Sequence, residues 1–166
     1  MSSEFRPQPQ PAPRYREVSI GHAPVAVTEE HGVLHMRSLE PLAELPARLL
    51  DRLVHWAQVR PEQTFIAARQ AGGDWRRVSY REMLDSVRAI AQGLLSYGLS
   101  AHKPLALLSG NDIEHLQVAL GAMYAGIPYC PVSPAYSLLS QDFAKLRHVC
   151  DLLQPGLVFV SDAAAY

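Results

Sequence analysis

Apolar and polar positions follow a regular order over residues 105–160. Short apolar runs at Leu105–Leu108, Tyr129–Val132 and Leu157–Val160 predict three buried strands. Between the runs, apolar residues recur every three or four positions, as on one face of a helix. The first set is Ile113, Leu116, Leu120 and Met123, and the second is Phe143, Leu146, Cys150 and Leu153.

Strands that alternate with helices of this length indicate consecutive βαβ units and a parallel sheet. Because such crossovers are right-handed, both helices should cover one face of the sheet unless the strand order reverses between them. We therefore predict an α/β fold, part of a three-layer parallel sheet. Gly121, Ala122 and Ala125 lie opposite the Leu116–Leu120 face, which predicts that the first helix packs closely on both sides.

The N-terminal half predicts two hairpins, each followed by a helix. The runs Val25–Glu30 and Val33–Arg37 flank His31-Gly32, which favours a β-hairpin with a two-residue turn. A helix is expected over Ala47–Val59. Its buried line is Leu49, Leu53 and Trp56, widened by Leu50, Val54 and Ala57.

The second hairpin is predicted from Thr64–Ala68 and Trp75–Val78, joined by a glycine-containing turn. Ser79 and Glu82 form the S-x-x-E pattern of a capping box, in which each side chain accepts from the other residue's backbone amide. The following helix should run to Tyr97, with Gly98 as its C-terminal stop. Met83, Val87, Ile90 and Leu94 form its apolar line.

Composition restricts the classes of function. Of 166 residues, 48% are hydrophobic and 19% are charged, which is typical of a globular protein. The net charge of −1 gives no basic surface for nucleic acid or an anionic membrane, and the longest apolar run, Val118–Ile127, is too short to cross a bilayer. Two cysteines form no disulfide framework, so we expect two buried, reduced thiols and a cytoplasmic protein.

The N-terminus reads MSSEFRPQPQPAPR, which has the composition of an extended, solvated segment and lacks the apolar core of a secretory signal. We expect residues 1–20 to form a disordered, proline-rich tail and residues 21–166 to form the N-terminal fragment of a larger domain.

Few residues carry chemistry in a pattern that sequence alone identifies. The turn after the first parallel strand, Ser109–Asp112, has neither a G-x-G-x-x-G nor a G-x-x-x-x-G-K-[ST] motif. Neither lysine, Lys103 or Lys145, lies in a glycine loop. Seven histidines have no spacing typical of a metal site; His148 and Cys150, for example, are two apart on a helix and point away from each other.

Three weak candidates for a substrate or nucleotide site remain. Asn111 begins the helix after the first parallel strand, where it can cap the helix with Glu114 or meet an anion. Ser133 and Tyr136 follow the second parallel strand at its carboxyl end, where α/β proteins build their sites. Packing against another part of the protein is the more ordinary role for Tyr136.

Several segments resemble a known family. They are WRRVSYREMLDSVRAIAQGLLSYGLS, KPLALLSGNDIEHLQVALGAMYAGIPYCPVSPAYSL and LLQPGLVFV. They are similar to the N-terminal part of the adenylate-forming acyl-CoA synthetases, the AMP-binding superfamily, over residues 16–166. The segment PVSPAYSL and the long N-terminal extension most resemble those of bacterial feruloyl-CoA synthetases.

The resemblance implies a parent enzyme that uses ATP, Mg²⁺ and coenzyme A to convert an acid into its thioester. It also implies that the family's Ser/Thr/Gly-rich loop ending in Pro-Lys-Gly, its later Glu and its C-terminal Lys have no counterpart here. No position can then be assigned as catalytic. We expect this portion to be inactive, to bind no cofactor by itself and to serve as scaffold.

Three alternatives stay open: a fatty-acid or other acyl-CoA ligase, a short interaction module without catalysis, and a flavodoxin-like nucleotide-binding protein. The expected partner is the rest of the adenylation domain. An isolated chain ending near Val160 would leave apolar surface and a strand edge exposed, so it should form homo-oligomers.

Overall fold

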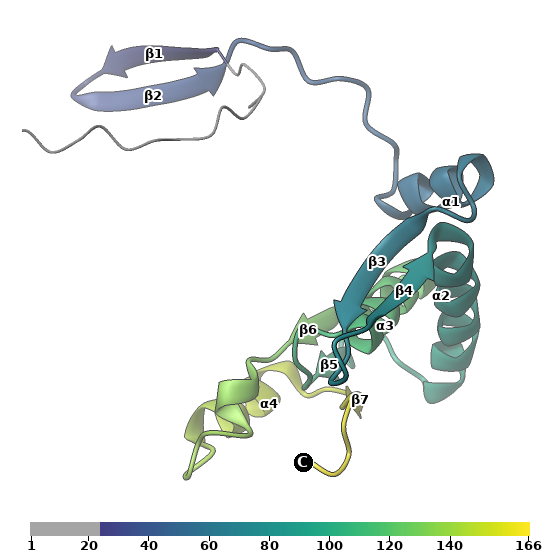
Figure 1. Cartoon of the computed structure of the whole chain (residues 1–166). Coiled ribbons are helices and arrows are strands. Elements are labelled where there is room, and N and C mark those ends of the chain that lie inside the picture. Colours follow the sequence, from purple (N-terminus) through teal and green to yellow (C-terminus); the bar gives the residue numbers. More distant parts are fainter. Residues whose placement is uncertain (1–23) are drawn as a thin grey trace, which may run out of the picture. The chain divides into compact units, whose positions relative to one another are not determined.

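The computed structural model describes residues 24–166, and the expected tail at residues 1–20 lies outside this range. The chain divides into two compact units, and the boundary along the sequence falls between Leu45 and Pro46. The first unit holds the predicted hairpin, β1 (Val25–Glu30) and β2 (Val33–Ser38), which pair antiparallel (Figure 1).

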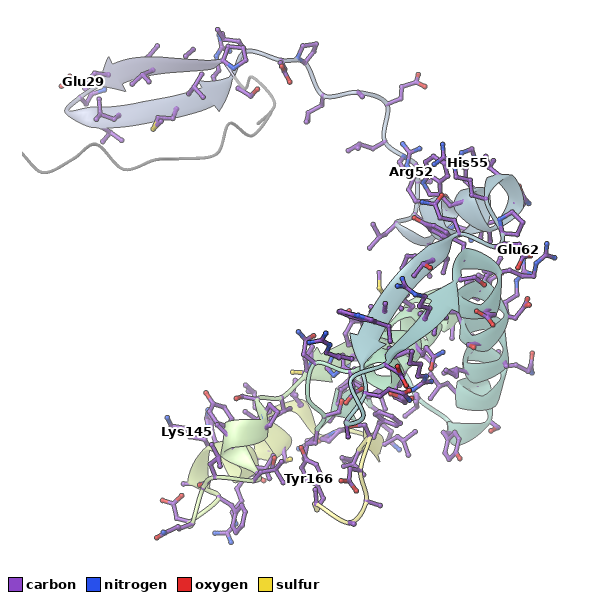
Figure 2. All side chains as sticks on the ribbon, in the orientation of Figure 1. Glu29, Arg52, His55, Glu62, Lys145 and Tyr166 are labelled. Atoms are coloured by element: carbon purple, nitrogen blue, oxygen red, sulfur yellow. The ribbon has the colours of Figure 1, made fainter. Side chains whose placement is uncertain are left out.

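The two residues at the turn of this hairpin adopt the backbone conformation that a two-residue turn needs. His31 and Gly32 both have positive φ, 54° and 78°, as a two-residue turn of the type I′ class requires. Side chains project from both faces of the ribbon, among them the labelled Glu29 (Figure 2). Met36 lies opposite Val27 in the register, and both are more than half exposed.

The second unit begins with a helix, a hairpin and a long helix. These are α1 (Leu50–Val59), β3 (Thr64–Arg69), β4 (Trp75–Ser79) and α2 (Tyr80–Leu94). The chain then passes through a short 3₁₀ turn, η1 (Leu95–Tyr97), to β5 (Leu105–Leu107) and α3 (Ile113–Ala125). It ends with β6 (Tyr129–Pro131), η2 (Pro134–Tyr136), α4 (Ala144–Leu153) and β7 (Leu157–Phe159).

The three parallel strands lie in the order β6-β5-β7, so the strand order does reverse between the two crossovers. Right-handed connections then carry α3 and α4 to opposite faces of the sheet. Alternation along β5 agrees with this arrangement: Leu105 and Leu107 pack with α3, whereas Ala106 clusters with Leu146 and Val149 of α4. The predicted three-layer α/β fold is confirmed.

Close packing of α2 on α3 forms the centre of this unit. Met83 and Val87 of α2 are completely buried, as their spacing predicts. Gly121 of α3 approaches Ile90 so closely that an added Cβ would lie 2.5 Å from Ile90 Cγ2. Gly126 ends α3 in the left-handed conformation that glycine adopts without strain. Over residues 24–166, no helix has the length and apolar character needed to cross a membrane.

The capping box at the start of α2 is present as predicted. The Glu82 amide donates to Ser79 Oγ at 3.3 Å, and the Ser79 amide donates to Glu82 Oε2 at 2.8 Å. The hydrogen bond from the Ser79 backbone, together with that of its side chain, lowers the pKa of Glu82.

Helix ends differ from prediction at three places. The first helix begins at Leu50 instead of Ala47. Asp51 in its first turn accepts hydrogen bonds from the backbone and the side chain of Arg48. Leu49, which was predicted on the buried line, is 68% exposed. Phe143 lies before α4 with φ of 53° and is exposed, so it does not join the apolar line. The helix α2 ends at Leu94, its last turn up to Tyr97 being 3₁₀.

Candidate functional site

An open hollow of about 430 Å³ lies at the carboxyl ends of β5 and β6. These strands are neighbours, and the loops that follow them run to helices on opposite faces of the sheet. In open α/β sheets, this reversal point is where ligands bind. We call it the switch-point hollow. Its lining is Ser109, Gly110, Asn111 and His115 from the first loop and helix, and Pro131, Val132, Ser133 and Pro134 from the second.

A serine and a histidine form the polar wall of the switch-point hollow. Ser109 Oγ lies 2.7 Å from Nδ1 of His115, and Ser109 is almost completely buried. The hydroxyl therefore fixes the imidazole ring, with the tautomer deciding which group donates. The lining contains no Lys or Arg, and His115 is its one titratable side chain.

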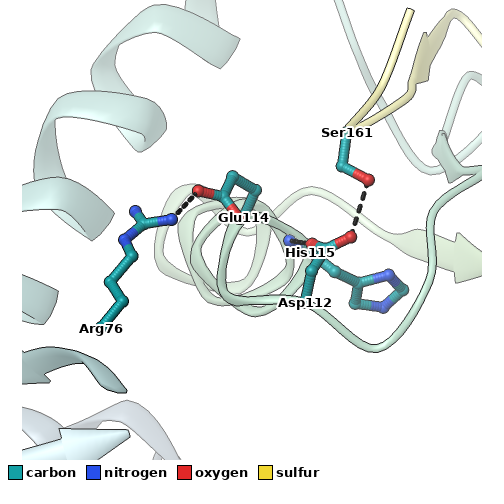
Figure 3. Close-up of polar contacts among 5 residues, drawn as sticks. All are labelled: Arg76, Asp112, Glu114, His115 and Ser161. Atoms are coloured by element: carbon teal, nitrogen blue, oxygen red, sulfur yellow. Dashed lines mark hydrogen bonds and ion pairs between the residues drawn. The ribbon is translucent and has the colours of Figure 1, made fainter. Parts of the chain in front are cut away.

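The first turn of α3 joins the hollow to the strand on the other side. Asp112 is the N-cap: its Oδ1 accepts from the His115 amide at 2.6 Å, and its Oδ2 accepts from Ser161 Oγ at 2.6 Å (Figure 3). Ser161 follows β7, so this carboxylate connects the loops after β5 and β7. The predicted capping pair of Asn111 and Glu114 is wrong, because the cap lies one residue later.

Glu114 has a different role. Its carboxylate pairs with the Arg76 guanidinium of β4, and both side chains are about 40% exposed (Figure 3). The ion pair holds the β3–β4 hairpin against the start of α3. Because exposed ion pairs contribute little, this contact positions the hairpin more than it stabilises it.

The chain matches the model of the AMP-binding enzyme family over residues 53–165, about two thirds of its length. The chain belongs to the AMP-binding enzyme family. The matched range contains β5, α3 and β6, and with them the switch-point hollow.

Curated relatives agree with membership of the AMP-binding enzyme family. A luciferin 4-monooxygenase of Luciola mingrelica is 29% identical over 84 residues, which is 51% of this chain and 14% of the relative. The hybrid PKS-NRPS synthetase mycA of Thermothelomyces thermophilus is 25% identical over 152 residues, which is 90% of this chain and 4% of the relative. The chain thus spans 14% or less of these relatives.

Solved structures share the fold. The fatty acid AMP ligase from Legionella pneumophila superposes with a TM-score of 0.61 at 20% identity, covering 68% of this chain and 19% of that one. CmiS6 gives 0.60 at 22% identity, covering 76% and 30%. The α/β architecture is therefore that of the N-terminal part of adenylate-forming ligases.

Two of the three candidates from sequence meet in this AMP-binding family fold. Asn111 and Ser133 line the switch-point hollow from its two sides, although Ser133 Oγ already accepts from the Ala135 amide at 3.3 Å. Tyr136 does not line it; the ring lies in η2, with the Lys145 ammonium 5.4 Å from its centroid. Sequence reasoning missed His115, whose position on the first turn of a helix that follows a strand was the available signal.

Within residues 24–166, no three His, Cys, Asp or Glu side chains lie together as metal ligands would. Cys130 and Cys150 are free, and both are half-buried where complete burial was expected.

Proposed function

We propose that this chain is the N-terminal part of an ATP-dependent acid–thiol ligase, and that the acid is an aromatic one of the ferulate type. The proposal rests chiefly on the stretch SGNDIEHLQVALGAMYAGIPYCPVSPAYSL, which lies within the matched family range. The same stretch builds the switch-point hollow. Its resemblance to feruloyl-CoA synthetases supports the aromatic substrate.

The proposed reaction has two steps. An oxygen of the acid's carboxylate attacks the α-phosphorus of ATP, and the bond to the β-phosphate breaks, releasing pyrophosphate. The thiol of coenzyme A then attacks the acyl carbon, its proton is lost, and AMP leaves with the electron pair of the broken C–O bond. No step is assigned to a metal held by residues 24–166.

The role proposed for this part of the protein is structural. The lining of the switch-point hollow lacks the Lys and Arg side chains that hold transferring phosphates. We therefore expect the phosphate-binding groups to come from elsewhere in the protein. Asn111, His115 and Ser133 would form a wall that hydrogen-bonds uncharged parts of a substrate or product.

The exposed apolar side chains of α4 and β7 support a partner that belongs to the same domain as this chain. No residue of α4 is fully buried, Leu152 is 74% exposed and Val158 of β7 is 48% exposed. We propose that the rest of an adenylation domain covers these side chains. For the 166-residue chain alone, sedimentation at tens of micromolar should then give a dimer or larger species, and a clean monomer would contradict this part.

The activity is tested with protein expressed from the complete reading frame that contains this chain. AMP formation is measured with ATP, coenzyme A and either ferulate or dodecanoate. We expect kcat/KM to be at least about tenfold higher for ferulate, as a pocket shaped for a ring discriminates against a flexible chain. The 166-residue chain, assayed in parallel, should form no AMP.

A fatty-acid ligase is the second candidate, and one observation favours it: the fatty acyl-adenylate ligase from L. pneumophila has a TM-score of 0.60. A preference for dodecanoate would select this alternative. If no acid stimulates AMP formation, the ligase proposal fails altogether.

A further inference from the structure

A cavity of about 280 Å³ lies among α1, α2 and α3, away from the switch-point hollow. We call it the helix cavity. It shares no lining residue with the hollow, and along α3 the nearest lining residues of the two, His115 and Met123, are eight positions apart. At 1.5 Å per residue this is a distance of roughly 12 Å. Nothing in the proposed ligase reaction uses this cavity.

Apolar side chains of the core form one part of its lining. Leu50 and Val54 come from α1 and Met123 comes from α3. Leu50 is buried, and Val54 and Met123 pack partly buried against the same core cluster. The ring of Tyr124, 42% exposed, lies beside them in the lining. A flat ring or short alkyl chain placed there would be removed from water.

The charged part of the lining has one cation in excess. Arg48 Nη2 lies 2.9 Å from Asp51 Oδ1, so that pair is neutral as a whole. Arg88 of α2, an exposed residue, also lines the cavity, and within residues 24–166 it makes no ion pair.

We propose that the helix cavity binds a small amphipathic monocarboxylate, with its apolar body against Leu50 and Met123 and its carboxylate on Arg88. A guanidinium offers a carboxylate two parallel N–H donors, a geometry that an amide or alcohol cannot use equally well. The volume is near the lower limit for ligand pockets, which limits the ligand to about the size of benzoate or hexanoate.

Methionine methyl NMR tests this proposal in the protein expressed from the complete reading frame. Methionines are labelled with ¹³C at the methyl group, and Met123→Leu identifies the signal of the cavity. Benzoate should shift that signal with a saturable curve and a Kd of about 1–10 mM, as expected for so few non-hydrogen atoms. The signals of Met36, in the hairpin, and Met83, in the core, should stay in place.

Charge dependence separates this site from general apolar binding. Benzamide, of equal shape and no charge, should bind about threefold to fivefold more weakly than benzoate, and Arg88→Gln should weaken benzoate binding by the same factor, because Arg88 is exposed. Arg52→Gln is the matched control, since Arg52 lies on α1 but does not line the cavity (Figure 2). The signal of the buried Met83 reports whether each variant is folded. Arg88→Lys keeps the charge and should bind benzoate with an affinity between those of the parent protein and Arg88→Gln.

Three results would overturn the proposal. The first is no shift of the Met123 signal up to about 50 mM benzoate, well above the expected Kd. The second is equal binding of benzoate and benzamide, or full benzoate affinity in folded Arg88→Gln. The third is a Met123 signal that moves with protein concentration alone, because a second copy of the chain would then occupy the cavity.

Discussion

At Gly121, α3 lies against Ile90 of α2 without room for a Cβ, and replacing this glycine with Ala tests the packing directly. A Cβ added there would lie 2.5 Å from Cγ2 and 3.0 Å from Cβ of Ile90, and 3.5 Å from the Ala91 amide nitrogen. Ile90 cannot relieve this contact by rotation alone, because its Cβ is fixed by the backbone and a β-branched residue in a helix has one favoured rotamer. The two helices must therefore move apart.

Two effects of opposite sign decide the magnitude. Gly→Ala in a helix interior gains about 1 kcal/mol from lower backbone entropy in the unfolded chain. Overpacking a tight interface costs about 1–3 kcal/mol, and contact with a fixed Cβ favours the upper end. We expect Gly121→Ala to lose about 1–2 kcal/mol of unfolding free energy. Gly93→Ala in α2 is the matched control, since nothing lies within 4 Å of its added Cβ, and it should be stabilising.

Urea unfolding followed by tryptophan fluorescence measures these changes, because Trp56 and Trp75 both belong to the unit that contains the contact. A double-mutant cycle with Ile90→Ala isolates the contact: removing Cγ2 should reduce the cost of Gly121→Ala by about 1 kcal/mol. The reasoning is refuted if Gly121→Ala is as stable as the parent, or if its cost is unchanged in the Ile90→Ala background.

Three further predictions concern helix ends. Asp112→Ala removes the cap of α3 and the acceptor for Ser161, and should cost about 1–3 kcal/mol in urea unfolding, whereas Asp112→Asn, an equally good cap, should retain most of the stability. The pKa of Glu82 is lowered in the folded state, so its ionised form stabilises the fold fully at pH values above its ordinary pKa of 4.5. This contribution is lost as pH falls through the lower folded-state pKa. Glu82→Gln should therefore flatten this part of an acid titration followed by circular dichroism, and an unchanged profile would contradict the prediction. Gln154 has φ of 46° at the end of α4, so Gln154→Gly should raise the thermal midpoint by the equivalent of about 1 kcal/mol. Gly126 has the same left-handed conformation at the end of α3, with no atom near an added Cβ, so Gly126→Ala should lower the midpoint by a similar amount.

Features set by neighbouring residues could be predicted from the sequence. The turn at His31-Gly32 and the capping box of Ser79 and Glu82 are both confirmed. In each, the deciding hydrogen bonds or backbone angles belong to residues no more than three positions apart. The helical spacing of Met83 and Val87 likewise identified the buried face of α2, because one amphipathic helix contains that information by itself.

The N-cap of α3 could not be fixed in this way. Asn111 and Asp112 are adjacent, and both residue types are preferred caps. The choice is decided by Ser161, 49 residues further along, whose hydroxyl donates to the second oxygen of Asp112. A local pattern holds no information on such a partner. Phe143 is a similar case, since its spacing fits the α4 line but its left-handed backbone places it outside the helix.

Strand order is the feature on which the site depends, and it is also non-local. Had β7 joined the sheet beside β6, α3 and α4 would cover one face, and the loops after β5 and β6 would leave in the same direction. Its position beside β5 separates those loops and opens the switch-point hollow between them. This is why Asn111 and Ser133, 22 positions apart, share one lining.

The position of the lysines then limits what the hollow can do. Lys103 precedes β5 and so lies at the opposite end of the strand from the hollow, and Lys145 lies over Tyr136, outside the lining. A triphosphate in the hollow would meet hydroxyls, an amide and the imidazole of His115, without a compensating cation from either lysine. The hollow therefore suits the uncharged part of a ligand, and under the proposed function the cations that hold the phosphates of ATP would come from other segments of the protein.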